Sequence, residues 1–143
     1  MNVAVLFQSL RGGTERAAES IAAEFVARDC SAGAYPVTNF DAQFVLKSDL
    51  LVIGTWTDGL FGLGARPAQM GKLLTLPSIA HKATALFVTY EISPKSSLAK
   101  LADWAERQGA DVVAQAGFHR KRPTEGLDEF VTAALDAVQP AAA

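Results

Sequence analysis

The chain has 143 residues, of which half are hydrophobic and a fifth are charged, and its formal net charge is −2. This length suits one domain with a core of its own, and we expect a single domain over residues 1–140. The charge balance argues against a nucleic-acid-binding protein, which favours a basic face. The single cysteine, Cys30, can form neither an internal disulfide nor a thiolate metal cluster, which favours a reducing cytoplasm. No apolar run approaches the roughly 20 residues that span a bilayer, and no signal peptide is recognised, so we expect a cytoplasmic protein without membrane insertion.

The first half of the chain alternates between strand-like and helix-like segments. Val3 to Phe7 is a continuous apolar run, typical of a strand buried on both faces. From Thr14 to Arg28 the apolar residues recur at helical spacing and form one stripe. The next segments predict a weaker strand over 34–40, a short helix over 41–46 and a third buried strand over 50–55.

The segment after the third strand is rich in glycine. Residues 54–64 contain four glycines, which predicts a loop. Pro67 then suits the first turn of a helix that reaches about Leu74. The apolar run from Ala83 to Tyr90 predicts a fourth strand.

The last third of the chain completes the alternation. Ser96 or Ser97 is suited to cap a helix that Gly109 ends. Residues 111–118 predict a fifth strand, and Thr124 is suited to cap the final helix. The expected buried face of that helix consists of Leu127, Phe130, Val131, Ala134, Leu135 and Val138.

Five strands that alternate with helices predict an α/β fold with a parallel sheet covered on both faces. Ligands of such sheets bind beyond the carboxyl ends of the strands, where the strand order reverses. The loops after the first, third and fourth strands are therefore the candidate site.

The loop after the first strand has the composition of a phosphate cradle. Gly12 and Gly13 allow the backbone to curl close to an anion at the start of a helix, whose N–H groups and dipole favour negative charge. Ser9 and Thr14 add hydroxyl donors, and Arg11 either adds a charge-assisted bond or points to solvent. The alternative is a tight strand-to-helix turn with no ligand. The chain has no Gly-x-x-x-x-Gly-Lys-Ser/Thr loop, which argues against a nucleotide-hydrolysing protein.

The segment from Val5 to Thr14 resembles the signature of the flavodoxin family. That signature reads two aliphatic residues, an aromatic, any residue, Ser or Thr, two variable residues, a small residue, any residue and Thr. The resemblance implies a flavodoxin-like three-layer fold, with a five-stranded parallel sheet of order 2-1-3-4-5 and helices on both faces. It also implies bound flavin mononucleotide (FMN). The residues that this implies for the phosphate loop are Ser9, Leu10, Arg11, Gly12, Gly13 and Thr14.

In flavodoxins the loop after the third strand places an aromatic or apolar residue against the flavin ring. Trp56 is the first candidate here and Phe61 the second, because ring stacking adds about 0.5–1.5 kcal/mol to burial. Each has the alternative of packing on the core or lying at a partner surface. Flavodoxins also flip a peptide of this loop on reduction, and the Asp58–Gly59 peptide is suited to that, unless Gly59 is an ordinary turn glycine. The implied cofactor-binding residues are Thr55, Trp56, Thr57, Asp58, Gly59 and Phe61.

The loop after the fourth strand adds Thr89, Tyr90 and Glu91 to the implied cofactor site. Tyr90 either stacks on the flavin or is a plain strand-end residue. Glu91 is expected near the pyrimidine edge, where its charge disfavours an anionic reduced flavin. Residues 119–122 form a basic cluster that is expected at the same edge of the sheet as the flavin site. This cluster is either a docking patch for an acidic partner, a site for the phosphate of a nicotinamide cofactor, or a solvated loop.

No residue pattern predicts a catalytic triad, a carboxylate pair or a metal site, which fits a protein whose cofactor carries the chemistry. The resemblance implies an FMN-binding electron carrier between a reductase and an acceptor enzyme, with redox proteins as partners and a monomeric state. One alternative is an FMN-dependent quinone or small-molecule reductase that uses NAD(P)H. A Gly-Thr-Pro-Thr loop is typical of flavodoxin-type quinone reductases, and here Trp56 replaces its proline. The other alternative is a binding module that has lost flavin chemistry.

Overall fold

A computed structural model of the chain describes residues 1–9, 12–60, 63–67 and 79–138. The strands are β1 (Asn2–Phe7), β2 (Ser31–Pro36), β3 (Leu50–Leu60), β4 (Leu63–Pro67), β5 (Ala83–Tyr90) and β6 (Asp111–His119). The described helices are α1 (Gly13–Ala27), α2 (Ala42–Lys47), α4 (Lys95–Arg107) and α5 (Leu127–Val138).

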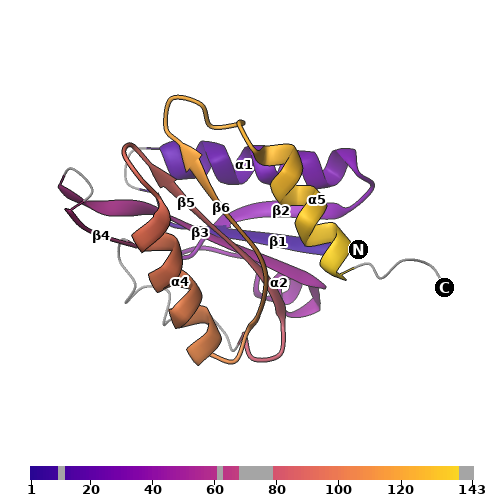
Figure 1. Ribbon diagram of the computed structural model, residues 1–143. Helices are drawn as coiled ribbons and strands as arrows, with labels where there is room; N and C mark the ends of the chain where they lie inside the picture. Colours follow the sequence, from indigo (N-terminus) through magenta and orange to yellow (C-terminus); the bar gives the residue numbers. More distant parts are fainter. Residues whose placement is uncertain (10–11, 61–62, 68–78, 139–143) are drawn as a thin grey trace.

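The main sheet has the strand order β2-β1-β3-β5-β6, and all these neighbours pair in parallel. This confirms the predicted order 2-1-3-4-5, with the fourth and fifth predicted strands now β5 and β6. Helices α1 and α5 cover one face, and α2 and α4 cover the other (Figure 1). The predicted three-layer α/β fold is therefore confirmed in the described part of the chain.

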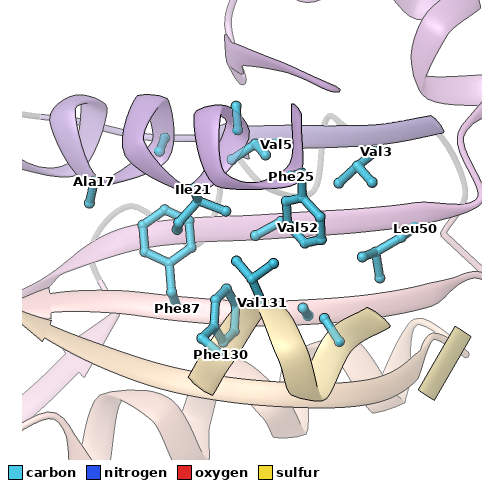
Figure 2. Packing of buried hydrophobic residues seen from close by; sticks show 14 of the residues in the cluster. Val3, Val5, Ala17, Ile21, Phe25, Leu50, Val52, Phe87, Phe130 and Val131 are labelled. Carbon is cyan, nitrogen blue, oxygen red and sulfur yellow. The ribbon is translucent and has the colours of Figure 1, made fainter. Parts of the chain in front are cut away.

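The sheet separates two apolar cores because successive side chains of a strand point to opposite faces. Along β1, Val3 and Val5 pack beneath α1 and α5, whereas Ala4 and Leu6 pack toward α2 and α4. Figure 2 shows the core beneath α1, in which the largest fully buried side chain of that helix is Phe25. Burial on both faces explains why the central strands read as continuous apolar runs.

Strand β2 begins at Ser31, three residues before the predicted start of the strand over 34–40. Helix α1 ends in a tight turn, in which Asp29 has a positive φ of 66° and the Cys30 N–H bonds the Phe25 carbonyl at 3.0 Å. The chain then joins the sheet at once, with the Ser31 N–H donating to the Met1 carbonyl at 2.9 Å. The prediction started late because small residues at a sheet edge carry little hydrophobic pattern.

The predicted loop over 54–64 is wrong in its described residues, because β3 runs on to Leu60 and pairs antiparallel with β4, which begins at Leu63. The pairing register shifts between Asp58 and Leu60, so Gly59 lies at an irregularity of this hairpin. Pro67 ends β4, which is an edge position that tolerates proline, and does not open a helix. The rest of the predicted helix, to about Leu74, lies outside the described residues.

Two predicted helix caps are also wrong. Helix α4 begins at Lys95 after Pro94, which places Ser96 and Ser97 inside its first turn. Helix α5 begins at Leu127, and the Phe130 N–H bonds the Gly126 carbonyl at 3.1 Å, so that Gly126 rather than Thr124 precedes the helix.

The other predictions for these two helices are confirmed. Gly109 ends α4 with a φ of +84°, a conformation that glycine adopts without strain. The buried face of α5 contains Phe130, Val131, Ala134 and Leu135, with Leu127 and Val138 partly buried against the same core.

Gly54, within β3, has no room for a side chain, because a Cβ atom there would overlap the fully buried ring of Phe87 on β5. We expect Gly54→Ala to lower the free energy of unfolding by about 1–3 kcal/mol, as overpacking of a filled core does. Urea denaturation measures this loss. Adding Phe87→Leu should restore part of it, because the two substitutions act on the same space. A Gly54→Ala protein as stable as the parent would contradict this packing.

Candidate functional site

A pocket of about 170 Å³ lies at the carboxyl edge of the sheet. It forms where the strand order reverses, since β1 pairs with β2 on one side and with β3 on the other. Residues from the segment after β1, from within β3 and β5, and from directly after β6 contribute to it. The lining residues are Ser9, Gly13, Thr14, Arg16, Trp56, Thr89 and Arg120.

The first wall of the pocket is the turn into α1. Gly12 precedes the helix with a φ of +83°, so this position requires glycine. Its N–H donates to Ser9 Oγ at 3.0 Å, which holds the turn closed. A Cβ atom added to Gly13 would meet no atom within 4 Å, so the helix start is open to a ligand. Open backbone at a helix N-terminus suits an anion.

A pair of buried hydroxyls forms the floor. Thr14 Oγ1 lies 2.9 Å from Thr89 Oγ1, and the two residues are only 2% and 3% exposed. Each hydroxyl carries one hydrogen, and the mutual bond uses one of the two. One hydroxyl hydrogen of the pair is therefore left to donate into the pocket that both residues line.

Trp56 forms the wall on the β3 side and is 8% exposed. Strand alternation puts it on the same face as Val52, beneath α1, and puts Thr55 and Thr57 on the opposite face, with Ile53. Thr55 is fully buried, and Thr57 is half-buried with an Oγ1 atom that has no hydrogen-bond partner in the structure. Among Thr55, Trp56 and Thr57, it is therefore Trp56 that lines the pocket.

Asp58 and Gly59, two other predicted site residues, belong by their backbone to the β3–β4 hairpin. The predicted site residues Leu10, Arg11 and Phe61 lie outside the described residues. The Asp58–Gly59 peptide therefore stays a prediction for a redox-linked flip, now within a strand rather than a loop.

Tyr90 and Glu91 lie beside the pocket without lining it, and both contact the end of β6. The Tyr90 ring meets the His119 ring edge-on, with 5.3 Å between centroids. The Tyr90 carbonyl accepts the Arg120 N–H at 3.0 Å, and Glu91 Oε2 lies 3.7 Å from Arg120 Nη1. These contacts tie the loop after β5 to the loop after β6.

Two pocket residues were missed by the sequence prediction. Arg16 was not assigned to the site, and Arg120 was named only within the basic cluster over residues 119–122. Arg16 could have been recognised from its position, because a cation in the first turn of a helix is unfavourable with the helix dipole unless an anion lies nearby. Arg120 could also have been recognised, because it directly follows the last strand, at the edge of the sheet where ligands bind.

A second pocket, of about 260 Å³, lies between the carboxyl ends of β1 and β2. Its lining residues are Phe7, Gln8, Ser9, Glu15, Pro36, Val37 and Thr38. Ser9 lines both pockets, so the turn after β1 separates them. The exposed residue Glu15 lines the second pocket, whereas Arg16 and Arg120 line the first, so the first pocket is the better candidate for an anion.

Other types of site find no support in the described part of the chain. Residues 1–9, 12–60, 63–67 and 79–138 contain no group of three or more His, Cys, Asp or Glu side chains placed to hold a metal ion. Among the described helices, none has both the length and the apolar character of a membrane span.

The sequence matches no protein-family model and no curated protein. Its structure, in contrast, superposes on solved flavodoxins. The two-electron-reduced flavodoxin of Megasphaera elsdenii aligns with a TM-score of 0.78 at 20% identity, over 94% of this chain and 99% of that one. Oxidised flavodoxin 1 of Bacillus cereus aligns with a TM-score of 0.70 at 20% identity, over 98% and 99% of the two chains.

The same fold occurs as a part of larger proteins. In rubredoxin:oxygen oxidoreductase of Desulfovibrio gigas the match has a TM-score of 0.72 at 18% identity, and covers 96% of this chain but 35% of that one. Together with the strand order, these likenesses show that this chain has the flavodoxin fold.

Proposed function

We propose that this flavodoxin-fold chain binds FMN, with the phosphate at the start of α1, and transfers electrons. The observation that carries the proposal is the pocket at the carboxyl edge. It brings an open helix start, a spare hydroxyl donor, an indole and two guanidinium groups together from four separate segments. A phosphate monoester attached to a flat apolar ring matches this combination of groups.

The residues present fit the cofactor. Ser9 and one hydroxyl of the Thr14–Thr89 pair would donate to the phosphate, and the glycines at 12 and 13 leave room for it against the backbone. Trp56 is placed to pack on an apolar part of the ligand and to exclude water there. When bound, FMN would supply one- and two-electron chemistry, while the protein tunes it through hydrogen bonds and charge.

The neighbours in structure support a redox role, since flavodoxins of this fold are described in an oxidised and in a two-electron-reduced state. The proposal includes protein partners, a reductase and an acceptor, and a monomeric carrier. It places the protein in a reducing cytoplasm, which agrees with a single buried cysteine that has no disulfide.

The first test is an absorption titration of the purified apoprotein with FMN, followed by stepwise reduction without oxygen. We expect saturable binding and a long-wavelength band at the one-electron stage, which marks a carrier that exchanges single electrons. Bound flavin that bleaches directly to the two-electron state would favour the NAD(P)H-dependent quinone reductase instead. Failure to bind FMN at all would refute the proposed function while leaving the fold in place.

A further inference from the structure

We propose that Arg16 and Arg120 form a charge clamp that closes on the phosphate of the cofactor and makes the site selective for FMN over the uncharged flavin riboflavin. The inference rests on the proposed function and deepens it. The described residues of the phosphate loop, Ser9 and Gly12 to Thr14, offer only neutral donors, namely hydroxyls and backbone N–H groups. The structure adds two guanidinium groups from distant parts of the chain to the same pocket.

Arg16 reaches the pocket from the first turn of α1. Its N–H bonds the Gly12 carbonyl at 3.0 Å, which fixes its place one turn above the glycine that opens the helix. Its Nη1 lies so near that turn that a Cβ atom on Gly12 would be 3.3 Å from it. A cation here opposes the helix dipole, and a bound anion between the two removes that repulsion.

Arg120 reaches the pocket from another part of the fold, directly after β6. Its backbone is held by the Tyr90 carbonyl, so the side chain starts from a fixed point. The guanidinium lies 3.7 Å from the Glu91 carboxylate, and both groups are exposed. An ion pair of this length and exposure is weak, which leaves Arg120 able to turn to a stronger anion.

The charges match a phosphate monoester. Such a group carries about −1.5 to −2 at pH 7, and two guanidinium groups carry +2 together. Riboflavin lacks the phosphate and gains nothing from either arginine. Because both arginines are partly exposed, salt is expected to screen the clamp and to weaken FMN binding more than riboflavin binding.

The test compares the affinities of Arg16→Gln, Arg120→Gln and the parent for FMN and for riboflavin, measured by flavin fluorescence quenching. Each substitution should weaken FMN binding by about ten-fold, the low end for a hydrogen bond to a charged group, and leave riboflavin affinity unchanged. The matched control is Arg122→Gln, from the same basic cluster, because Arg122 pairs with Glu125 at 2.9 Å and does not line the pocket. The control should bind both flavins as the parent does.

Glu91→Gln tests the clamp in the opposite direction. Removing the carboxylate that competes for Arg120 should strengthen FMN binding by about two-fold, which is the scale of an exposed ion pair. The same substitution in the Arg120→Gln variant should leave FMN binding unchanged, because the arginine is already gone. The clamp is refuted if both arginine variants bind FMN as tightly as the parent, or if riboflavin affinity falls by the same factor as FMN affinity.

A second measurement separates this inference from the proposed function. Thermal unfolding of the apoprotein with inorganic phosphate needs no flavin, and phosphate should raise the midpoint of the parent more than that of either arginine variant. If the parent binds phosphate through the arginines yet binds no FMN, the proposed function fails and the clamp stands as an anion site. If the parent gains no stability from phosphate and the FMN affinities of the variants are unchanged, the clamp alone fails.

Discussion

Removing the three hydroxyls that line the first pocket, by Ser9→Ala with Thr14→Val and Thr89→Val, is expected to weaken FMN binding by a factor of about 100 or more. Ser9 contributes one donor, and the Thr14–Thr89 pair contributes one more after its mutual bond. Each hydrogen bond to a charged group is worth about 1.5–3 kcal/mol, so losing two costs at least about 100-fold in affinity. Fluorescence titration with FMN measures the change.

The threonine pair is best replaced as a unit. Val at both positions removes two partners together, which is nearly neutral for stability, whereas Thr14→Val alone leaves the buried Thr89 hydroxyl unsatisfied and should cost about 1–3 kcal/mol. Urea denaturation should show that the double valine variant is more stable than Thr14→Val alone. Thr14→Ser retains the hydroxyl and serves as the binding control.

An FMN affinity of the triple variant equal to that of the parent would contradict the phosphate-loop assignment. The arginine clamp would then be the main source of phosphate affinity. The two sets of variants therefore divide the binding energy of the phosphate between neutral and charged donors.

Phe118→Ala is expected to lower the free energy of unfolding by about 3–5 kcal/mol, the largest stability effect of any substitution considered for this chain. Phe118 is 1% exposed on β6. Its ring meets Phe87 and Phe130 edge-on, with centroids 6.0 and 5.7 Å away. The three rings join β5, β6 and α5, so the truncation opens a cavity where a strand pair meets its covering helix.

Chemical denaturation measures this loss against two controls. Phe118→Leu keeps most of the buried volume and should cost much less than the alanine variant. Ile92→Ala changes a side chain that is 59% exposed and should stay within about 0.5 kcal/mol of the parent. A Phe118→Ala protein that loses under about 1 kcal/mol would show that this core can collapse around the cavity.

Local patterns along the chain were sufficient to predict most of the fold. The continuous apolar run from Val3 to Phe7 and the helical apolar stripe on α1 are local signals, which can be recognised from neighbouring residues alone. Five such strands alternating with helices leave few topologies, because crossovers are right-handed and connections are short. The order of the main sheet followed from this and from the resemblance in the phosphate loop.

Pairing between distant segments could not be predicted from local sequence patterns. Glycines marked residues 54–64 as a loop, but a strand forms there because β4 supplies backbone partners to the end of β3. The start of β2 at Ser31 likewise depends on its pairing with Asn2, and not on its own small side chains.

The candidate site likewise has one part that the sequence predicts and another that depends on the tertiary structure. By itself, the sequence determined where a phosphate loop is to be expected, over residues 9–14, because such a loop is a local arrangement of glycines, hydroxyls and a helix start. Only the tertiary structure decided that Thr14 bonds Thr89, 75 positions away, and that Arg16 and Arg120 line one pocket. The physical reason is that parallel strands bring their carboxyl ends to one edge, so residues far apart in the chain become neighbours there.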